Sequence, residues 1–393
     1  MRFLIILFLL TIFQQLKAQQ IMNTTGIQKI ISNIEHTYAP DNRTVLFNIS
    51  YKQTFGTKVS LSGETSSEIA KTELLNDLQK NQYKYIDSIV VLPEKKLGDK
   101  IYGLIDVSVA SLRTKPEQAA ELATQALLGS RVKILKELRS WDLVQTPDKY
   151  IAWMESGNLE KLNKSQLNNW DSSKRIIYTK EYGTCFSKED VHSIPVSDLV
   201  AGNLFKEINR DNNFVKVEFP DKRIGYIPDN ECEDFNSWLN TRHINAENII
   251  STAKKLMGTP YLWGGTSTKL MDCSGFTRTV FFLNGILLPR DASQQVNVGL
   301  AVDTKNGFSN LKPGDLLFFG EKATAKTKEK VSHVAIYLGN EEFIHESEMV
   351  RVNSFDVNRK NFSLDRLTQF IRAKRIIDSV GKNKVELLKD IDY

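Results

Sequence analysis

The spacing of apolar residues changes along the chain and separates an N-terminal region from the rest. A helical spacing over Ile27–His36 precedes β-rich runs at Thr44–Tyr51 and Lys58–Leu61, and a second helical pattern covers Glu64–Lys80. This mixture predicts a small α+β region over residues 19–97. The region carries no chemical motif, and the sequence does not indicate its role.

From about Gly98 the pattern becomes short alternating runs separated by turn residues, which predicts strands. Two stretches within it, Leu143–Trp153 and Lys216–Tyr226, share Pro-Asp-Lys-x-Ile followed by an aromatic residue. Proline fixes φ and aspartate can bond its own backbone, so Pro-Asp-Lys between alternating strands is typical of a hairpin. A chance match of turn residues is the alternative; the common register favours two small barrels, over residues 98–175 and 176–240.

A third pattern begins near Asn245. A helical stretch over Ala246–Met257 ends at Gly258, a common helix terminator, and strand-like runs follow at Asp315–Phe319, His333–Leu338 and Glu342–Ile344. A helical half followed by an antiparallel half is an α+β plan, which we assign to residues 241–380. The fold class predicted for the whole chain is α+β.

Composition agrees with a soluble globular protein of several domains. The chain has 393 residues, of which 41% are hydrophobic and 25% charged. The net charge of +5 is spread thinly, with no basic block to bind phosphates, so we expect no nucleic-acid partner. The sequence has no His-Glu-x-x-His, no Cys-x-x-Cys and no glycine-rich phosphate loop, so neither a metal nor another cofactor is expected.

The N-terminus predicts export. Met1-Arg2 supplies a positive start, and an apolar run from Phe3 to Phe13 follows, which is typical of a secretory signal peptide over residues 1–18, cleaved after Ala18. Leu16 stands where a small residue is usual, so the cut itself stays open. The run is shorter than the about 20 residues of a membrane span. We therefore expect a periplasmic or extracellular monomer with no membrane partner after signal removal.

Cys273 is the candidate nucleophile. It precedes an apolar, helix-like run, and a helix N-terminus stabilises a thiolate, so its pKa is expected to be low. His333 opens one predicted strand and His345 closes the next, so adjacent strands would bring a base and an orienting imidazole together. An inert buried thiol is the alternative. Cys185 and Cys232 either form a disulfide or remain buried thiols.

Five motifs in this order resemble the NlpC/P60 cysteine peptidases: Tyr-x-Trp-Gly-Gly, Asp-Cys-Ser-Gly-Phe, Leu-Lys-Pro-Gly-Asp, Ser-His-Val-Ala-Ile-Tyr-Leu-Gly and Phe-Ile-His. The resemblance spans about Ile249–Ile376 and implies a papain-like fold. It makes Cys273 the nucleophile, His333 the base and His345 the orienting residue, and it places Tyr261 beside the oxyanion. The barrel repeats resemble bacterial SH3-like domains.

Family members with two such barrels resemble γ-D-glutamyl-L-diamino acid endopeptidases of the dipeptidyl-peptidase VI type. This implies peptidoglycan stem peptides or muropeptides as partners, with a free N-terminal L-Ala whose ammonium needs a carboxylate, for which we select Glu121. The other substrate residues implied are Tyr150, Trp263, Asp272, Ser274 and Ser293. The alternatives are an amidase or acyltransferase on the same fold, and a non-catalytic wall-binding protein.

Two positions depart from the family pattern. Glu346 follows His345 where a small residue is more familiar, and a carboxylate there would shift the charge state of His345. Lys269-Leu-Met replaces the usual glycine-containing approach to Asp272, which would reshape the leaving-group pocket.

Overall fold

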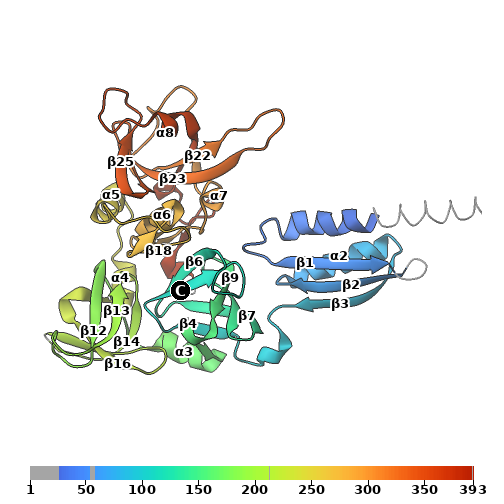
Figure 1. Ribbon diagram of the computed structural model, residues 1–393, viewed down its shortest axis with the longest axis horizontal. Coiled ribbons are helices and arrows are strands. Elements are labelled where there is room, and N and C mark those ends of the chain that lie inside the picture. The colour runs from blue at the N-terminus through green and yellow to red at the C-terminus, as the bar shows by residue number, and fades with distance from the viewer. Residues whose placement is uncertain (1–25, 54–57, 212, 392) are drawn as a thin grey trace, which may run out of the picture. The chain divides into compact units, whose positions relative to one another are not determined.

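The computed structural model describes residues 26–53, 58–211, 213–391 and 393, and the predicted signal peptide lies outside them. The chain divides into two compact units, one up to Gly98 and one from Asp99 to Tyr393 (Figure 1). None of the helices in the described ranges has the length and hydropathy needed to cross a membrane.

The N-terminal unit is a small α+β fold, as the hydrophobic pattern predicts. Strand β1 (Phe47–Gln53) pairs antiparallel with β2 (Lys58–Thr65), and β2 pairs in parallel with β3 (Lys84–Val91). Helix α2 (Glu68–Lys80) makes the crossover between β2 and β3, and a helix over residues 26–38 precedes the sheet. Apolar residues of both helices pack against strand residues to form the core of this unit.

The second unit begins with an SH3-like barrel. Its strand order is β10-β4-β7-β8-β9-β5-β6, and helix α3 (Lys164–Ser172) follows it. The strands are β4 (Tyr102–Ile105), β5 (Val109–Arg113), β6 (Leu122–Leu127), β7 (Arg131–Leu138), β8 (Trp141–Gln145), β9 (Ile151–Glu155) and β10 (Leu159–Leu162).

A second SH3-like barrel repeats this topology. Its order, β13-β12-β16-β15-β14-β11-β17, is that of the first barrel when strands are matched in chain order, and helix α4 (Phe235–Asn240) follows. The strands are β11 (Arg175–Tyr178), β12 (Tyr182–Phe186), β13 (Pro195–Val200), β14 (Leu204–Arg210), β15 (Phe214–Glu218), β16 (Ile224–Pro228) and β17 (Cys232–Asp234).

The predicted Pro-Asp-Lys hairpins are confirmed. Each turn joins the two matched strands, β8 to β9 and β15 to β16. Lys149 and Lys222 occupy the same turn position with φ of 66° and 74°, and each donates its backbone N–H to the residue three positions earlier. The shared sequence pattern therefore encodes one backbone conformation twice, which excludes a chance match of turn residues.

The rest of the unit is a mixed α and β domain built on a six-stranded antiparallel sheet, in the order β21-β26-β22-β23-β24-β25. Helix α6 (Cys273–Phe282) lies against this sheet (Figure 1), and its Phe276 and Val280 share a core with Val334 and Ile344. The other sheet strands are β21 (Leu300–Val302), β22 (Leu316–Glu321), β23 (Lys330–Gly339), β24 (Glu342–Ser347), β25 (Met349–Ser354) and β26 (Phe370–Arg375).

Shorter elements surround the sheet, and the chain continues past residue 380 into the same unit. The strand β27 (Glu386–Leu387) pairs with β20 (Ile286–Leu287), and Leu388 behind it is buried. The remaining elements are α5 (Ala246–Lys255), β18 (Thr266–Ser267), β19 (Leu270–Met271), α7 (Ala292–Gln295) and α8 (Leu364–Gln369).

A single apolar cluster joins both barrels to the helical side of this domain. It contains Leu127 from β6 and Val200 from β13, and Phe282 from the end of α6 packs with them. The ring of the C-terminal Tyr393 lies 5.0 Å from that of Phe282. We call this set of buried residues the shared cluster; it fixes the barrels against the helix that begins at Cys273.

Candidate active site

Asp272 caps the helix that begins at Cys273. Its Oδ1 accepts the N–H of Gly275 at 2.7 Å, and its Oδ2 accepts the N–H of Gly264 at 3.0 Å. A side chain at Gly275 would meet the carbonyl oxygen of Gly265 at 2.0 Å, so only glycine fits there. The sequence thus fixes a tight loop against the first turn of α6, with the sulfur at the helix N-terminus as expected.

Arg290 fixes the carboxylate of Asp272 in its capping position. Its guanidinium, 1% exposed, forks onto Asp272 with Nη2 to Oδ2 at 2.6 Å and Nη1 to Oδ1 at 3.1 Å. Nη1 also donates to Ser274 Oγ at 3.0 Å, and Nε donates to Thr124 Oγ1 of the first barrel at 3.0 Å. Sequence reasoning missed Arg290, because no motif surrounds it and its partners are distant in the chain.

The Cys273 thiol is buried, with 6% of the residue exposed, and its Sγ lies 4.0 Å from the carbonyl oxygen of Ser332, next to His333. Burial, reinforced by Asp272, raises the pKa of the thiol to about 12, although the backbone N–H groups of Val334 and Ser274 lower it. The expected low pKa is therefore wrong. One of these N–H groups, that of Ser274, belongs to the helix, but loss of water outweighs both.

The two predicted histidines meet. His333 Nε2 lies 2.7 Å from His345 Nδ1, and the rings are nearly perpendicular at 87°. Gly339 closes β23 and a tight turn at Asn340-Glu341 leads into β24, so the two strands pair. Both histidines lie inside their strands and not at the ends, because β23 begins at Lys330 and β24 runs on to Ser347.

The hydrogen bonds of Asn353, on β25, show which ring nitrogens of His345 and His333 carry a proton. Its Nδ2 donates to the carbonyl oxygen of Asn361 at 3.0 Å, so its Oδ1 accepts from His345 Nε2 at 2.8 Å. Since His345 Nε2 then carries a proton, its Nδ1 accepts from His333 Nε2. The remaining nitrogen of His333, Nδ1, is left as an unprotonated acceptor, which is what a general base requires.

Both imidazoles are neutral at physiological pH. Burial lowers the pKa of His345 to about 4, although Asn353 opposes it. Burial, with Arg366 and His345, lowers the pKa of His333 well below 6.5. Arg366 and Asn353 are further site residues that the sequence did not reveal, because both depend on which strands and helices pack around the pair.

Glu346 does not act on His345 as expected. It is fully buried, but successive side chains on a strand point to opposite faces, and the pKa of His345 is set by burial, by the Asn353 hydrogen bond and by nearby arginine charges. The Lys269 ammonium forms an ion pair with Asp198 of the second barrel, and an effect of this altered approach to Asp272 on the leaving-group pocket stays a prediction.

Residues 258–372 match the NlpC/P60 family model, and residues 112–159 match that of the bacterial dipeptidyl-peptidase SH3 domain. Dipeptidyl-peptidase 6 of Lysinibacillus sphaericus is 26% identical over 67% of this chain and 96% of its own length. The γ-D-glutamyl-L-lysine dipeptidyl-peptidase of Bacillus cereus is 28% identical over 58% of this chain and 68% of its own.

The chain carries an NlpC/P60 domain and is a cysteine peptidase. The crystal structure of an NlpC/P60 family protein from Bacillus cereus has the same fold, with a TM-score of 0.59 and 24% identity over 70% of this chain and 99% of that one. Residues of the NlpC/P60 domain and of the SH3-like part thus combine in one described unit.

The first barrel brings its predicted residues to the NlpC/P60 domain. The indole Nε1 of Trp263 donates to Glu121 Oε1 at 2.6 Å, and strand β6 docks on β18 because Thr266 bonds both the side chain and the backbone of Gln125. Tyr150 OH lies 3.2 Å from Asp291 Oδ2, where Asp291 caps helix α7.

The other predicted residues belong to the NlpC/P60 domain itself. Ser293 lies on α7, which Asp291 caps, and Ser274 donates to Asp272 at 3.1 Å. Tyr261 is 36% exposed, and burial, together with Cys273 and Asp272, raises the pKa of its phenol, so this hydroxyl stays protonated and able to donate.

Cys185 and Cys232 are buried free thiols, so no disulfide joins them. Within the described ranges no group of three or more His, Cys, Asp or Glu side chains is arranged to hold a metal ion.

Proposed function

We propose that this peptidase hydrolyses the γ-D-glutamyl-L-diamino acid bond of peptidoglycan stem peptides that carry a free N-terminal L-Ala. The relatives named for γ-D-glutamyl-L-lysine dipeptidyl-peptidase activity support the bond. Recognition of the free N-terminal ammonium is supported by the hydrogen bond between Glu121 and Trp263. This bond holds a carboxylate of the first barrel beside the peptidase domain, where it can pair with an ammonium. The exported location expected from residues 1–18 suits such a substrate.

The chemistry follows from the assigned protons. His333 Nδ1 takes the proton of the Cys273 thiol as sulfur attacks the γ-carbonyl carbon of D-Glu, and the oxyanion accepts hydrogen bonds from the Cys273 N–H and the Tyr261 hydroxyl. The carbon–nitrogen bond then breaks, and His333 returns its proton to the leaving amine. Water attacks the thioester, giving its proton to His333, and the acyl group leaves with a free carboxylate as the thiol reforms.

In this proposal His345 orients His333, with Asn353 fixing the tautomer of both. A neutral thiol and a neutral imidazole form the resting pair. Substrate binding displaces water from around the thiol, and proton transfer accompanies attack instead of preceding it. The aligned backbone N–H groups at the start of α6 stabilise the charge that develops on the sulfur and on the oxyanion.

Turnover of L-Ala-γ-D-Glu-L-Lys, followed by mass spectrometry of the products, tests the nucleophile. Cys273→Ala should abolish release of free lysine, while Cys232→Ala, which removes another buried thiol, should retain it. Melting curves show whether both variants fold. Activity in the folded Cys273→Ala variant would refute the mechanism. Intact tripeptide with the wild-type chain would favour the amidase, acyltransferase or wall-binding alternatives.

The ammonium site has its own test. Glu121→Gln keeps an oxygen for the Trp263 indole but loses the charge, so KM for the free-amine tripeptide should rise about tenfold. The N-acetylated tripeptide should be cleaved poorly, and equally, by wild type and variant. An unchanged KM in Glu121→Gln would remove Glu121 from the proposal.

A further inference from the structure

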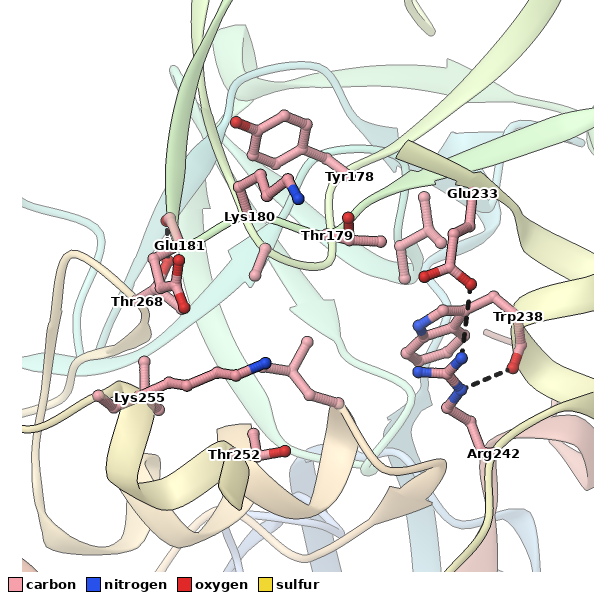
Figure 2. Close-up of a pocket in the computed structure, with 14 residues that line it drawn as sticks. Tyr178, Thr179, Lys180, Glu181, Glu233, Trp238, Arg242, Thr252, Lys255 and Thr268 are labelled. Atoms are coloured by element: carbon pink, nitrogen blue, oxygen red, sulfur yellow. Dashed lines mark hydrogen bonds and ion pairs between the residues drawn. The ribbon is translucent and has the colours of Figure 1, made fainter. Parts of the chain in front are cut away.

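A cavity of about 550 Å³ lies between the second SH3-like barrel and the NlpC/P60 domain, away from Cys273 (Figure 2). The loop from Tyr178 to Glu181 forms its barrel wall, and Thr252 and Lys255 of α5 form the opposite wall. Leu283, at the end of α6, also lines it, so the length of that helix, about 15 Å, separates the cavity from the thiol. The volume is within the range of small-molecule sites.

Two ammonium groups face this space, and no carboxylate in the described part of the chain pairs with them. Lys180 comes from the barrel and Lys255 from α5, and Figure 2 shows both side chains reaching into the cavity. Neither lysine has a hydrogen bond or ion pair with another described side chain. Two cations converging from different domains attract an anionic group, because each raises the local positive potential.

A carboxylate, that of Glu181, lines the cavity on the same side of the view as the two lysines and follows Lys180 in the chain (Figure 2). Glu181 gives only its backbone oxygen to the fold, accepting from Thr268 Oγ1 at 2.6 Å, and its carboxylate has no hydrogen bond or ion pair among the described residues. The cavity thus presents two unpaired ammonium groups and one unpaired carboxylate. A ligand that satisfies all three carries an anionic and a cationic end.

The remaining charges are already neutralised within the fold. Arg242 Nη2 pairs with Glu233 Oε2 at 3.4 Å, and Arg242 Nε donates to the carbonyl oxygen of Trp238 at 3.0 Å. The guanidinium also stacks on the Trp238 ring at 5.1 Å. Arg242, Glu233 and Trp238 therefore form a wall of the cavity, and Ile177 and Leu256 add apolar surface that can contact an aliphatic side chain.

We propose that this cavity is a second ligand site, which binds a short zwitterionic peptide. The peptide carboxylate lies between Lys180 and Lys255, and its ammonium pairs with Glu181. Such peptides are the chemical class that a peptidase releases, but the site does not depend on the proposed function, because none of its residues belongs to the Cys273 site.

The test uses the full chain carrying Cys273→Ala, with L-alanyl-L-alanine as the probe in isothermal titration calorimetry. The dipeptide should bind saturably, and its C-terminal amide or N-acetyl form should bind at least about tenfold more weakly. Lys180→Met with Lys255→Met should weaken dipeptide binding by a similar factor. Lys254→Met, an exposed neighbour on α5 that does not line the cavity, is the matched control and should bind normally.

Two further variants separate the competing outcomes. Glu181→Gln should weaken binding of the dipeptide but not of its N-acetyl form, while Glu121→Gln should change neither. Absence of saturable heat with the dipeptide would overturn the proposal, as would binding that Glu121→Gln abolishes and the double lysine variant leaves intact. Equal binding of inorganic phosphate with no effect of Glu181→Gln would indicate an anion site instead, which also overturns it.

Discussion

We expect the buried carboxyl group of Glu346 to make the free energy of unfolding depend on pH, and the substitution Glu346→Gln to remove this contribution. Its side chain is fully buried, and neither carboxylate oxygen has a hydrogen-bond partner among the described residues. Burial, opposed by Arg351 and reinforced by Asp272, raises the pKa of Glu346 from 4.5 to about 8. The folded protein therefore keeps this carboxyl neutral at physiological pH, where the unfolded chain ionises it.

The direction and size of the change in stability with pH follow from the protons bound by the folded and unfolded states. Between pH 4.5 and about 8 the folded state holds a proton that the unfolded state has lost, so stability falls as pH rises and levels off above about 8. Each pH unit contributes about 1.4 kcal/mol, so from about pH 6 to pH 9 the free energy of unfolding should fall by about 3 kcal/mol from this group alone.

Glu346→Gln removes the titration while keeping the shape. The amide is buried without partners too, but that cost, about 1–3 kcal/mol, does not vary with pH. Urea unfolding followed by tryptophan fluorescence suits the measurement, because all five tryptophans lie after residue 98 and report on the second unit. The difference between wild type and variant should change by about 3 kcal/mol across this pH range, since other groups titrate alike in both.

Glu348→Gln is the matched control. Its side chain is 78% exposed and its ion pair with Arg351, at 3.3 Å, is worth little, so its stability should follow the wild-type pH curve. If Glu346→Gln loses stability with pH as steeply as wild type, the carboxyl is already ionised in the folded state and the argument fails.

Three further predictions concern the active site. Arg290→Met leaves the Asp272 carboxylate buried without its counter-ion, so urea unfolding should show a loss of about 3–5 kcal/mol, and a loss below about 1 kcal/mol would contradict this. Asn353→Ala frees the tautomer of His345, so kcat for the tripeptide should fall roughly tenfold or more with KM unchanged; an unchanged kcat in a folded variant would exclude the relay. Alkylation of Cys273 by iodoacetamide should still accelerate above about pH 9, as its raised pKa requires, and a plateau below neutral pH would contradict burial of the thiol.

Most of the fold is predictable from the sequence, because it depends on residues that are close together in the chain. The Pro-Asp-Lys turns depend on residues adjacent in the chain, so their hairpins were predictable, and Cys273 was placed at a helix start because Asp272 and the apolar run beside it are local signals. The pairing of His333 with His345 followed from two neighbouring strands.

Interactions between distant segments were not predictable in the same way. Arg290 binds Thr124 of another domain, and Asn353 reaches His345 through strand register, which no spacing in the sequence reveals. The pKa of Cys273 was predicted in the wrong direction because its sign depends on how much water the fold removes from the sulfur. The sequence predicts which residues react, whereas the charge states of those residues depend on how the fold packs around them.

The shared cluster implies that the peptidase is not a string of independent modules. Cutting the chain after the second barrel would leave Phe282 and its neighbours on the helical side in contact with solvent, so the excised catalytic part should be prone to self-association. An unrelated barrel that replaced either of the two would have to supply the same apolar contacts to the shared cluster. Any exchange of a barrel is therefore constrained by an apolar interface that does not include Cys273.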